Sequence, residues 1–255
     1  MEFQKKPRLT PNEIRLLSLI GFVAAIVLSI LVGVNIGLSR AVEGGGEFYS
    51  AWNGARMFLF SHVNPYNLDV ALQAQQLAYG RAAPNGQNPY YLTIPFFLLP
   101  VYFPFVLISN ILPALFPSKF VVDPNVVRGL WLIVNESALL TTVFLVLRLI
   151  EWSPRRLFLI ALFLLSIFTF YSVSALLDGT PVILLCLLYF WILYSFKMGR
   201  DELAGALLVL TFFRWEVGLL FLVLVVWRAY SEQRTRVLNG FGMFMVVLLI
   251  ASFLM

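Results

Sequence analysis

Long apolar runs separated by short polar stretches dominate this chain. The first run covers residues 16–38, and the later runs cover 90–117, 130–150, 157–177, 182–196, 203–227 and 237–255. A helix needs about 20 apolar residues to cross a bilayer, and several of these runs reach that length. The pattern therefore predicts an all-α protein, a polytopic transmembrane helical bundle that forms a single membrane domain over residues 1–255.

Two of the runs contain residues that interrupt a straight crossing. Proline occurs five times in 90–117, and proline inside a helix removes a hydrogen bond and clashes with the preceding turn. We expect a re-entrant pair of short helices there, which enters the membrane and returns. The run 203–227 carries Arg214 near its middle, and we expect two half-helices that meet at this residue.

The polar stretch 39–89 is predicted to be an outer loop with helices of its own. Three glycines at 44–46 give the chain a tight path out of the first helix. Apolar residues then recur at helical spacing over 48–59, opposite Ser50, Asn53 and Arg56, which predicts a helix lying in the membrane interface. Asn67 and Gly80 predict the ends of a second short helix over 68–79, and Pro84-Asn85-Gly86 predicts a turn.

Basic residues are unevenly distributed between the two sides of this topology. With residues 1–15 as a cytoplasmic leader, twelve of the 18 Lys and Arg residues fall inside and five outside, while Arg214 lies within a run. Such an excess is typical of cytoplasmic loops. We expect a multi-pass protein of the cell membrane with a cytoplasmic N-terminus, an uncleaved first span at 16–38 and the loop 39–89 outside. Because the chain stops at the apolar end of its last run, we expect 90–255 to hold only part of the remaining spans, either of a longer protein or of a shortened relative of one.

Composition excludes several classes of function. The chain is 60% hydrophobic and 12% charged, which excludes a soluble domain. Its net charge of +5 reflects basic residues in the cytoplasmic loops and does not indicate nucleic-acid binding. The single cysteine, Cys186, excludes an intrachain disulfide and a cysteine metal cluster. There is no Walker loop, dinucleotide fingerprint or nucleophile elbow. No carboxylates have metal-ligand spacing, so we predict no metal site and no cofactor.

The candidate chemical groups are ionisable or polar residues at the predicted outer surface. Glu47 begins the first loop helix, where a carboxylate is also stabilised simply by the helix N-terminus. Arg214 can grip a phosphate through two parallel hydrogen bonds, or merely hold helices together by pairing with Glu216 or Glu136. Asp178-Gly179-Thr180 closes a helical hairpin, where Asp178 can approach a sugar hydroxyl or only make the turn. His62 lies about 22 Å along a continuous helix from Glu47, too far to pair with it.

The order of several short motifs resembles the GT-C superfamily of integral-membrane glycosyltransferases, and in particular bacterial mannosyltransferases that use polyprenyl-phosphate sugars. That branch has an acidic-Phe pair, an aromatic helix and a Pro-Tyr-Asp or Pro-Tyr-Asn corner after its first span, matched here by Glu47-Phe48, 49–60 and Pro65-Tyr66-Asn67. Next come a Tyr-x-Pro element with a proline-punctuated stretch, matched over 91–104, and a Trp-Leu span with an Asn, matched over 131–135.

The later motifs of that family are a Gly-Gln turn and a Lys-Pro interruption. Asp178-Gly179-Thr180 and Arg214-Trp215 occupy these places, and Glu47 stands where the family has aspartate. The resemblance implies glycosyl transfer from a polyprenyl-phosphate sugar to a lipid or glycan hydroxyl on the non-cytoplasmic face, among membrane lipids and without nucleic acid. It implies Glu47 as general base and Arg214 as the group that holds the donor phosphate, with Asp178, Thr180, Tyr66 and Tyr91 as further substrate-binding residues.

Two other classes of function fit the same residues. A transporter or flippase for a related lipid would use Glu136, Arg214 and Glu216 as its substrate site. A non-catalytic membrane subunit would use the aromatic spans only for packing. Further spans and an outer loop beyond residue 255 would favour the enzyme.

Overall fold

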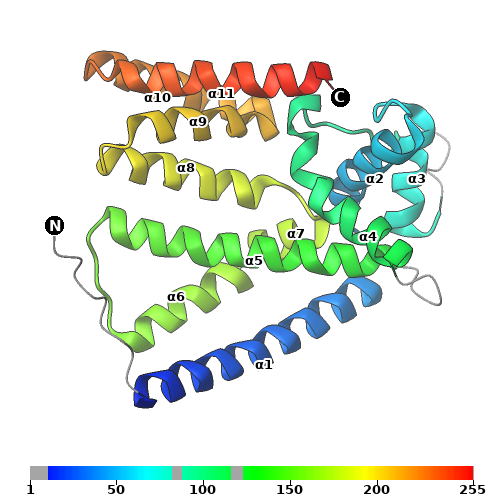
Figure 1. Ribbon diagram of the computed structural model, residues 1–255, viewed down its shortest axis with the longest axis horizontal. Helices are drawn as coiled ribbons and strands as arrows, with labels where there is room; N and C mark the ends of the chain where they lie inside the picture. Colours follow the sequence, from blue (N-terminus) through cyan, green and yellow to red (C-terminus); the bar gives the residue numbers. More distant parts are fainter. Residues whose placement is uncertain (1–10, 82–87, 116–122, 255) are drawn as a thin grey trace.

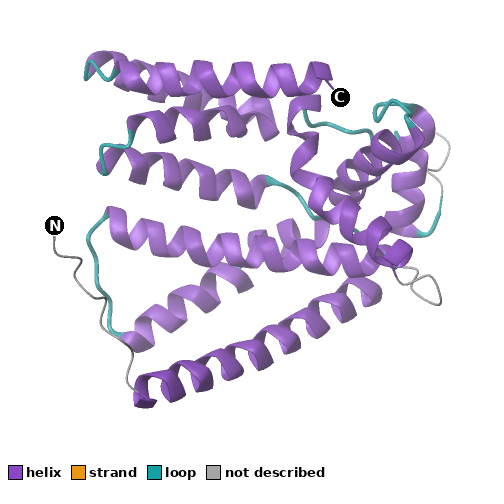
Figure 2. Cartoon of the chain, viewed as in Figure 1, coloured by secondary structure: helices purple, strands orange, loops and turns teal. Residues whose placement is uncertain are grey.

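Every regular element in the described residues, 11–81, 88–115 and 123–254 of a computed structural model, is helical (Figures 1 and 2). This confirms the predicted all-α bundle. Four helices are long and apolar enough to cross a membrane, or five if the bent pair α6 and α7 is counted as one span, which indicates a multi-pass membrane protein.

The elements are α1 (Pro11–Ala41), α2 (Gly46–Ser61), α3 (Leu68–Tyr79), η1 (Phe96–Tyr102), α4 (Phe103–Leu115), α5 (Pro124–Leu149), α6 (Arg156–Phe168), α7 (Phe170–Asp178), α8 (Val182–Lys197), α9 (Asp201–Leu210), η2 (Thr211–Arg214), α10 (Trp215–Ser231) and α11 (Thr235–Leu254).

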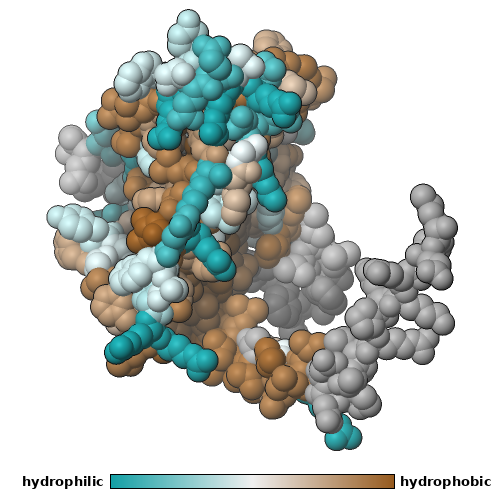
Figure 3. Space-filling view, turned by 90° about the vertical axis from the view of Figure 1, so that its left-hand side faces the viewer, coloured by the Kyte–Doolittle hydropathy of each residue, from teal (hydrophilic) through white to brown (hydrophobic). Residues whose placement is uncertain are grey.

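The long helices pass back and forth between two ends of the bundle. At the end on the left of Figure 1, the Lys197 ammonium donates to the carbonyl of Leu149 at 2.9 Å, which joins the ends of α5 and α8. Arg234, before α11, donates to the Phe196 carbonyl at 3.0 Å. Figure 3 faces this end and shows hydrophilic side chains gathered across it. The opposite end carries α2, α3 and the turn between α7 and α8.

The predicted half-helices around Arg214 are present. By length and composition Asp201–Ser231 qualifies as one span of 31 residues, which as a straight helix would be about 46 Å long. However, Arg234, just beyond this stretch, lies 3.2 Å from the carboxylate of Asp201 at its start. The chain therefore reverses at η2, and α10 runs back toward the beginning of α9.

Two other predicted elements differ from the structure. In place of a re-entrant pair over 90–117, η1 continues into α4 with Phe103 in helical geometry, so the prolines tighten this segment into a 3₁₀ helix without reversing it. The straight span predicted over 157–177 is instead two helices bent by 50° on either side of Thr169, which has extended backbone angles.

The prediction that α2 exposes a polar face with Ser50 and Asn53 is wrong for the first half of this helix. Ser50 and Asn53 are buried, as are the apolar residues around them. Phe48 stacks on Trp131 of α5 with ring centroids 5.6 Å apart, and Tyr102 of η1 packs on the same indole at 5.0 Å. The first half of α2, apart from Glu47, is therefore buried, and its apolar side chains belong to the main hydrophobic core.

The short helix predicted over 68–79 is confirmed at both of its ends. α3 spans Leu68–Tyr79, with Asn67 as N-cap residue and Gly80 as C-cap residue in the left-handed conformation. The predicted turn at 84–86 lies outside the described residues.

Candidate functional site

A buried arginine organises the glycine loop between α1 and α2. Arg128, in the first turns of α5, is only 1% exposed. Its guanidinium donates to the carbonyls of Ser39 at 3.2 Å, Val42 at 2.8 Å and Leu177 at 2.7 Å. The charge is thus solvated by backbone oxygens, which ties the end of α1 to the end of α7.

The glycines of this loop are needed for its close packing. Gly44 and Gly45 have φ of 133° and 77°, in the region that favours glycine. A Cβ on Gly45 would lie 2.6 Å from Nε of Arg128. A Cβ on Gly46 would lie 2.6 Å from the Tyr90 ring. The glycine loop therefore fits between the Arg128 side chain and the Tyr90 ring. It leads directly into the first turn of α2, where Glu47 lies.

The turn between α7 and α8 packs against the same loop. The indole N–H of Trp131 donates to the Gly179 carbonyl at 2.9 Å, and a Cβ on Gly179 would lie 2.6 Å from Cβ of Phe48. Gly179 also has a positive φ of 68°. These contacts bring Thr180 beside the beginning of α2.

Glu47 and Arg214 form an ion pair at this junction although 167 residues separate them. The hydroxyl of Thr180 lies 3.5 Å from Nη2 of Arg214. The Glu47 and Arg214 side chains are 30% and 28% exposed, so the pair is partly open to a ligand. The N-termini of α2, α8 and α10 converge here, and the partial positive charge of each favours an anion.

The pair retains hydrogen-bonding capacity. Among the described residues, neither Oε2 of Glu47 nor Nε of Arg214 has a partner. The fully buried Tyr102 hydroxyl has none there either. Burial, and then the nearby Glu47 carboxylate, raise the pKa of Tyr102, so its hydroxyl stays protonated and can donate.

A pocket of about 330 Å³ opens directly on Glu47. The extended segment before η1 forms its opposite wall, through Asn88, Tyr90 and Tyr91. Tyr90 is fixed by a 2.9 Å hydrogen bond between its hydroxyl and that of Tyr79. Burial and this bond raise the pKa of Tyr79 to about 12, so the Tyr79 phenol remains neutral. The pocket thus combines one carboxylate with neutral polar and aromatic groups, which is typical of sites for small polar ligands.

The structure brings together four of the six predicted site residues. Glu47, Arg214 and Thr180 are in one cluster, and Tyr91 lines the pocket at Glu47. Asp178 is exposed at the end of α7, beside the cluster, and is not one of the residues lining the pocket. Tyr66 instead donates its hydroxyl to the Ile94 carbonyl at 2.9 Å, which braces the chain before η1.

The ion pairs considered for Arg214 are wrong, because it pairs with Glu47. Glu216 is exposed on the first turn of α10. Glu136 accepts a 3.0 Å hydrogen bond from Asn35 and so joins α5 to α1. His62 is exposed at the far end of α2 from Glu47, as expected.

Sequence reasoning missed Arg128, Tyr90 and Tyr102. The predicted span began at residue 130, which left Arg128 outside as a loop cation. Asp123-Pro124 marks the true start of α5, since the Asp123 side chain accepts from the Asn125 N–H and proline occupies the first turn. That signal would have placed Arg128 inside a span, where an ionisable residue is a functional candidate. Tyr90 and Tyr102 had no comparable local signal.

Metal ligands do not gather in the part of the chain that the structure describes: no three His, Cys, Asp or Glu side chains lie close enough to hold an ion. The resemblance to glycosyltransferases rests on motif order alone. A scan of protein-family models and searches of curated proteins and of solved structures found no match to this chain.

Proposed function

We propose that this protein is a membrane glycosyltransferase. It moves a hexose, mannose-like sugar from a polyprenyl-phosphate donor to a hydroxyl of a lipid or glycan acceptor on the non-cytoplasmic face. The observation that carries the proposal is the ion pair of Glu47 with Arg214, together with the pocket that the Glu47 carboxylate also lines. It sets a group that can accept a proton beside a cation that can hold a phosphate, as this reaction requires.

The two residues would act in sequence on donor and acceptor. The donor phosphate would bind the Arg214 guanidinium, and the partial positive charge at the N-termini of α8 and α10 would stabilise it there. This would break the ion pair and release the Glu47 carboxylate. The acceptor oxygen would then form a bond to the anomeric carbon while the bond from that carbon to the phosphate oxygen breaks. The phosphate leaves with the electron pair, and the acceptor proton passes to Glu47.

The neighbouring groups support this division of roles. Thr180 lies against Arg214, on the side where the phosphate would bind. Asn88, Tyr90 and Tyr91 line the space on the other side of Glu47, where an acceptor or the transferred sugar would sit. No hydrogen bond or ion pair joins Glu136, Arg214 and Glu216, the three described groups of the transporter hypothesis, and this supports the enzyme.

Replacing Glu47 by Gln tests the proposal. Gln is nearly isosteric and keeps hydrogen bonding to Arg214, but it cannot accept a proton. Because general-base catalysis contributes about 10²–10⁴-fold, transfer of labelled sugar from a polyprenyl-phosphate donor in membranes should fall by about that factor. The assay uses the longest native form of the protein. Arg214→Ala should weaken donor binding as well as turnover.

Glu43→Gln is the matched control, since Glu43 lies in the same loop, is exposed and is outside the pocket lining. It should leave transfer unchanged. Unchanged transfer in Glu47→Gln would remove Glu47 as the base. Absence of transfer by the native protein with every polyprenyl-phosphate sugar would contradict the enzymatic function itself.

A further inference from the structure

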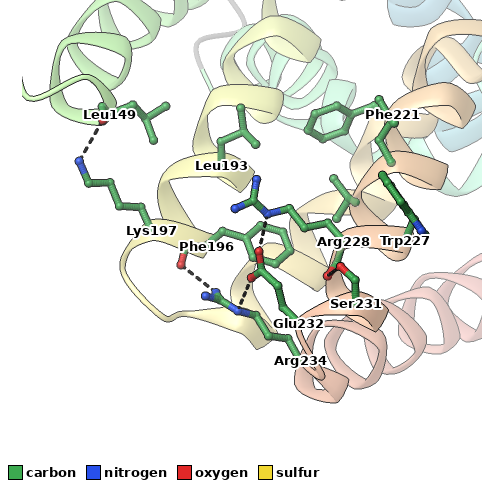
Figure 4. Close-up of a pocket in the computed structure, with 12 residues that line it drawn as sticks. Leu149, Leu193, Phe196, Lys197, Phe221, Trp227, Arg228, Ser231, Glu232 and Arg234 are labelled. Atoms are coloured by element: carbon green, nitrogen blue, oxygen red, sulfur yellow. Dashed lines mark hydrogen bonds and ion pairs between the residues drawn. The ribbon is translucent and has the colours of Figure 1, made fainter.

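A second cavity lies at the opposite end of the bundle, between α8, α10 and the end of α5 (Figure 4). Its volume is about 820 Å³. We call it the basic-end groove. Its apolar wall and its charged mouth are formed by Leu149, Leu193, Phe196, Lys197, Phe221, Leu224, Val225, Trp227, Arg228, Ser231, Glu232 and Arg234.

The groove has one closed end and one open, polar end. Tyr189 of α8 and Phe221 of α10 meet with ring centroids 4.2 Å apart and close it toward the centre of the bundle. From Phe221 to Arg228 the wall follows two turns of α10, about 10 Å. Trp227 is 70% exposed beside the mouth. Tryptophan is enriched where hydrocarbon meets water, so we expect the mouth at the level of lipid headgroups.

Three cations and one carboxylate line the mouth, namely Lys197, Arg228, Arg234 and Glu232, and the Asp201 carboxylate lies 3.2 Å from Arg234 beside them. Glu232 accepts from Nε of Arg228 and from Nε of Arg234, each at 2.9 Å. Lys197 is occupied by backbone carbonyls and by Glu151 at 2.7 Å.

Arg228 keeps free donors. Within the described residues its two terminal NH₂ groups meet no acceptor, and in Figure 4 they turn toward Leu193 inside the groove. The ion pair to Glu232 at i,i+4 holds the guanidinium in this direction.

We propose that the basic-end groove binds one anionic phospholipid. The acyl chain would lie on Leu193, Phe221 and Leu224, and the phosphate would accept hydrogen bonds from the terminal NH₂ groups of Arg228. The free donors of Arg228 beside an exposed apolar wall suit this ligand, since basic pockets between membrane helices bind anionic headgroups. The site is separate from the Glu47 and Arg214 pair, so it stands or falls independently of the proposed enzymatic function.

Native mass spectrometry of the purified full chain tests this, after delipidation and addition of equal amounts of phosphatidylglycerol and phosphatidylcholine. The protein should retain one phosphatidylglycerol in preference to phosphatidylcholine. In Arg228→Gln this preference should fall by about tenfold, as expected for loss of charge-assisted hydrogen bonds. Arg156→Gln removes the same charge at the same end of the bundle but outside the groove, and it should retain the preference.

A second pair of variants separates a lipid from a soluble phosphate. Leu224→Trp fills the apolar wall and should reduce retention of the lipid, whereas Leu220→Trp, one turn away on the same helix and outside the groove lining, should not. Equal losses in Arg228→Gln and Arg156→Gln would show diffuse attraction and overturn the site. So would retention without preference for phosphatidylglycerol, or an unchanged preference in Leu224→Trp.

Discussion

At the scale of residues, the Glu47 site depends on hydrogen bonds between a buried arginine and backbone carbonyls. The Arg128 guanidinium is held by three backbone carbonyls from two helix ends, and the glycine loop packs directly on it. A buried charge is costly unless hydrogen bonds compensate it, and here Nη1 and Nη2 are bonded while Nε has no partner among the described residues. The position of Glu47 therefore depends on a buried cation that does not line the Glu47 pocket.

Gly45→Ala should destabilise the protein by about 2–4 kcal/mol. The substitution combines left-handed strain of about 1–2 kcal/mol with overpacking against Arg128, whose side chain cannot move without losing its carbonyls. Gly80→Ala is the control, because Gly80 also has positive φ but has open space around it; it should cost only the strain. Thermal unfolding in detergent checks both, and equal shifts in Tm would contradict tight packing of the glycine loop.

At the scale of elements, the reversal at η2 depends on close helix packing. A Cβ on Gly205 of α9 would clash with the carbonyl of Val237, and one on Gly240 of α11 with that of Glu202. Small residues allow two helix backbones to approach in this way. α9 is only 10 residues long, so its contact with α11 fixes the half-helix that leads to Arg214.

Gly205→Val should therefore loosen the contact between α9 and α11. We expect it to lower the free energy of unfolding by about 1–3 kcal/mol, the usual cost of overpacking. In contrast, Gly242→Val on α11, where nothing lies within 4 Å of the added Cβ, should change stability little. The fraction of protein that stays monodisperse after heating in detergent measures the difference. Comparable losses in both variants would argue against the close α9–α11 contact.

At the scale of the whole molecule, the two ends of the bundle carry different chemistry. The glycine loop, the α7–α8 turn and η2 meet at one end, while the last turns of α5, α8 and α10 meet at the other. The basic residues predicted to face the cytoplasm include Arg148, Lys197, Arg228 and Arg234, which lie at this second end. An orientation with this end inside follows the usual excess of positive charge.

Single cysteines test this orientation in a Cys186→Ser background. Asn88→Cys, beside the Glu47 pocket, and Gln233→Cys, between α10 and α11, are both at exposed positions. A membrane-impermeant maleimide added to intact cells should label the first and not the second, and permeabilisation should expose both. Labelling of both positions from outside would contradict the proposed topology.

The sequence by itself determined the helical membrane class and most helix positions, because apolar run length and capping residues act locally. It also singled out Glu47, Thr180 and Arg214 as candidates, and the break at Arg214, since an ionisable residue in an apolar run is costly wherever it lies. Only the tertiary structure decided which groups meet. The pairing of Glu47 with Arg214 rather than Glu216, the burial of α2 and the role of Arg128 depend on contacts between residues far apart in the chain. Such contacts leave no periodic pattern in the sequence, because they are set by how the helices pack.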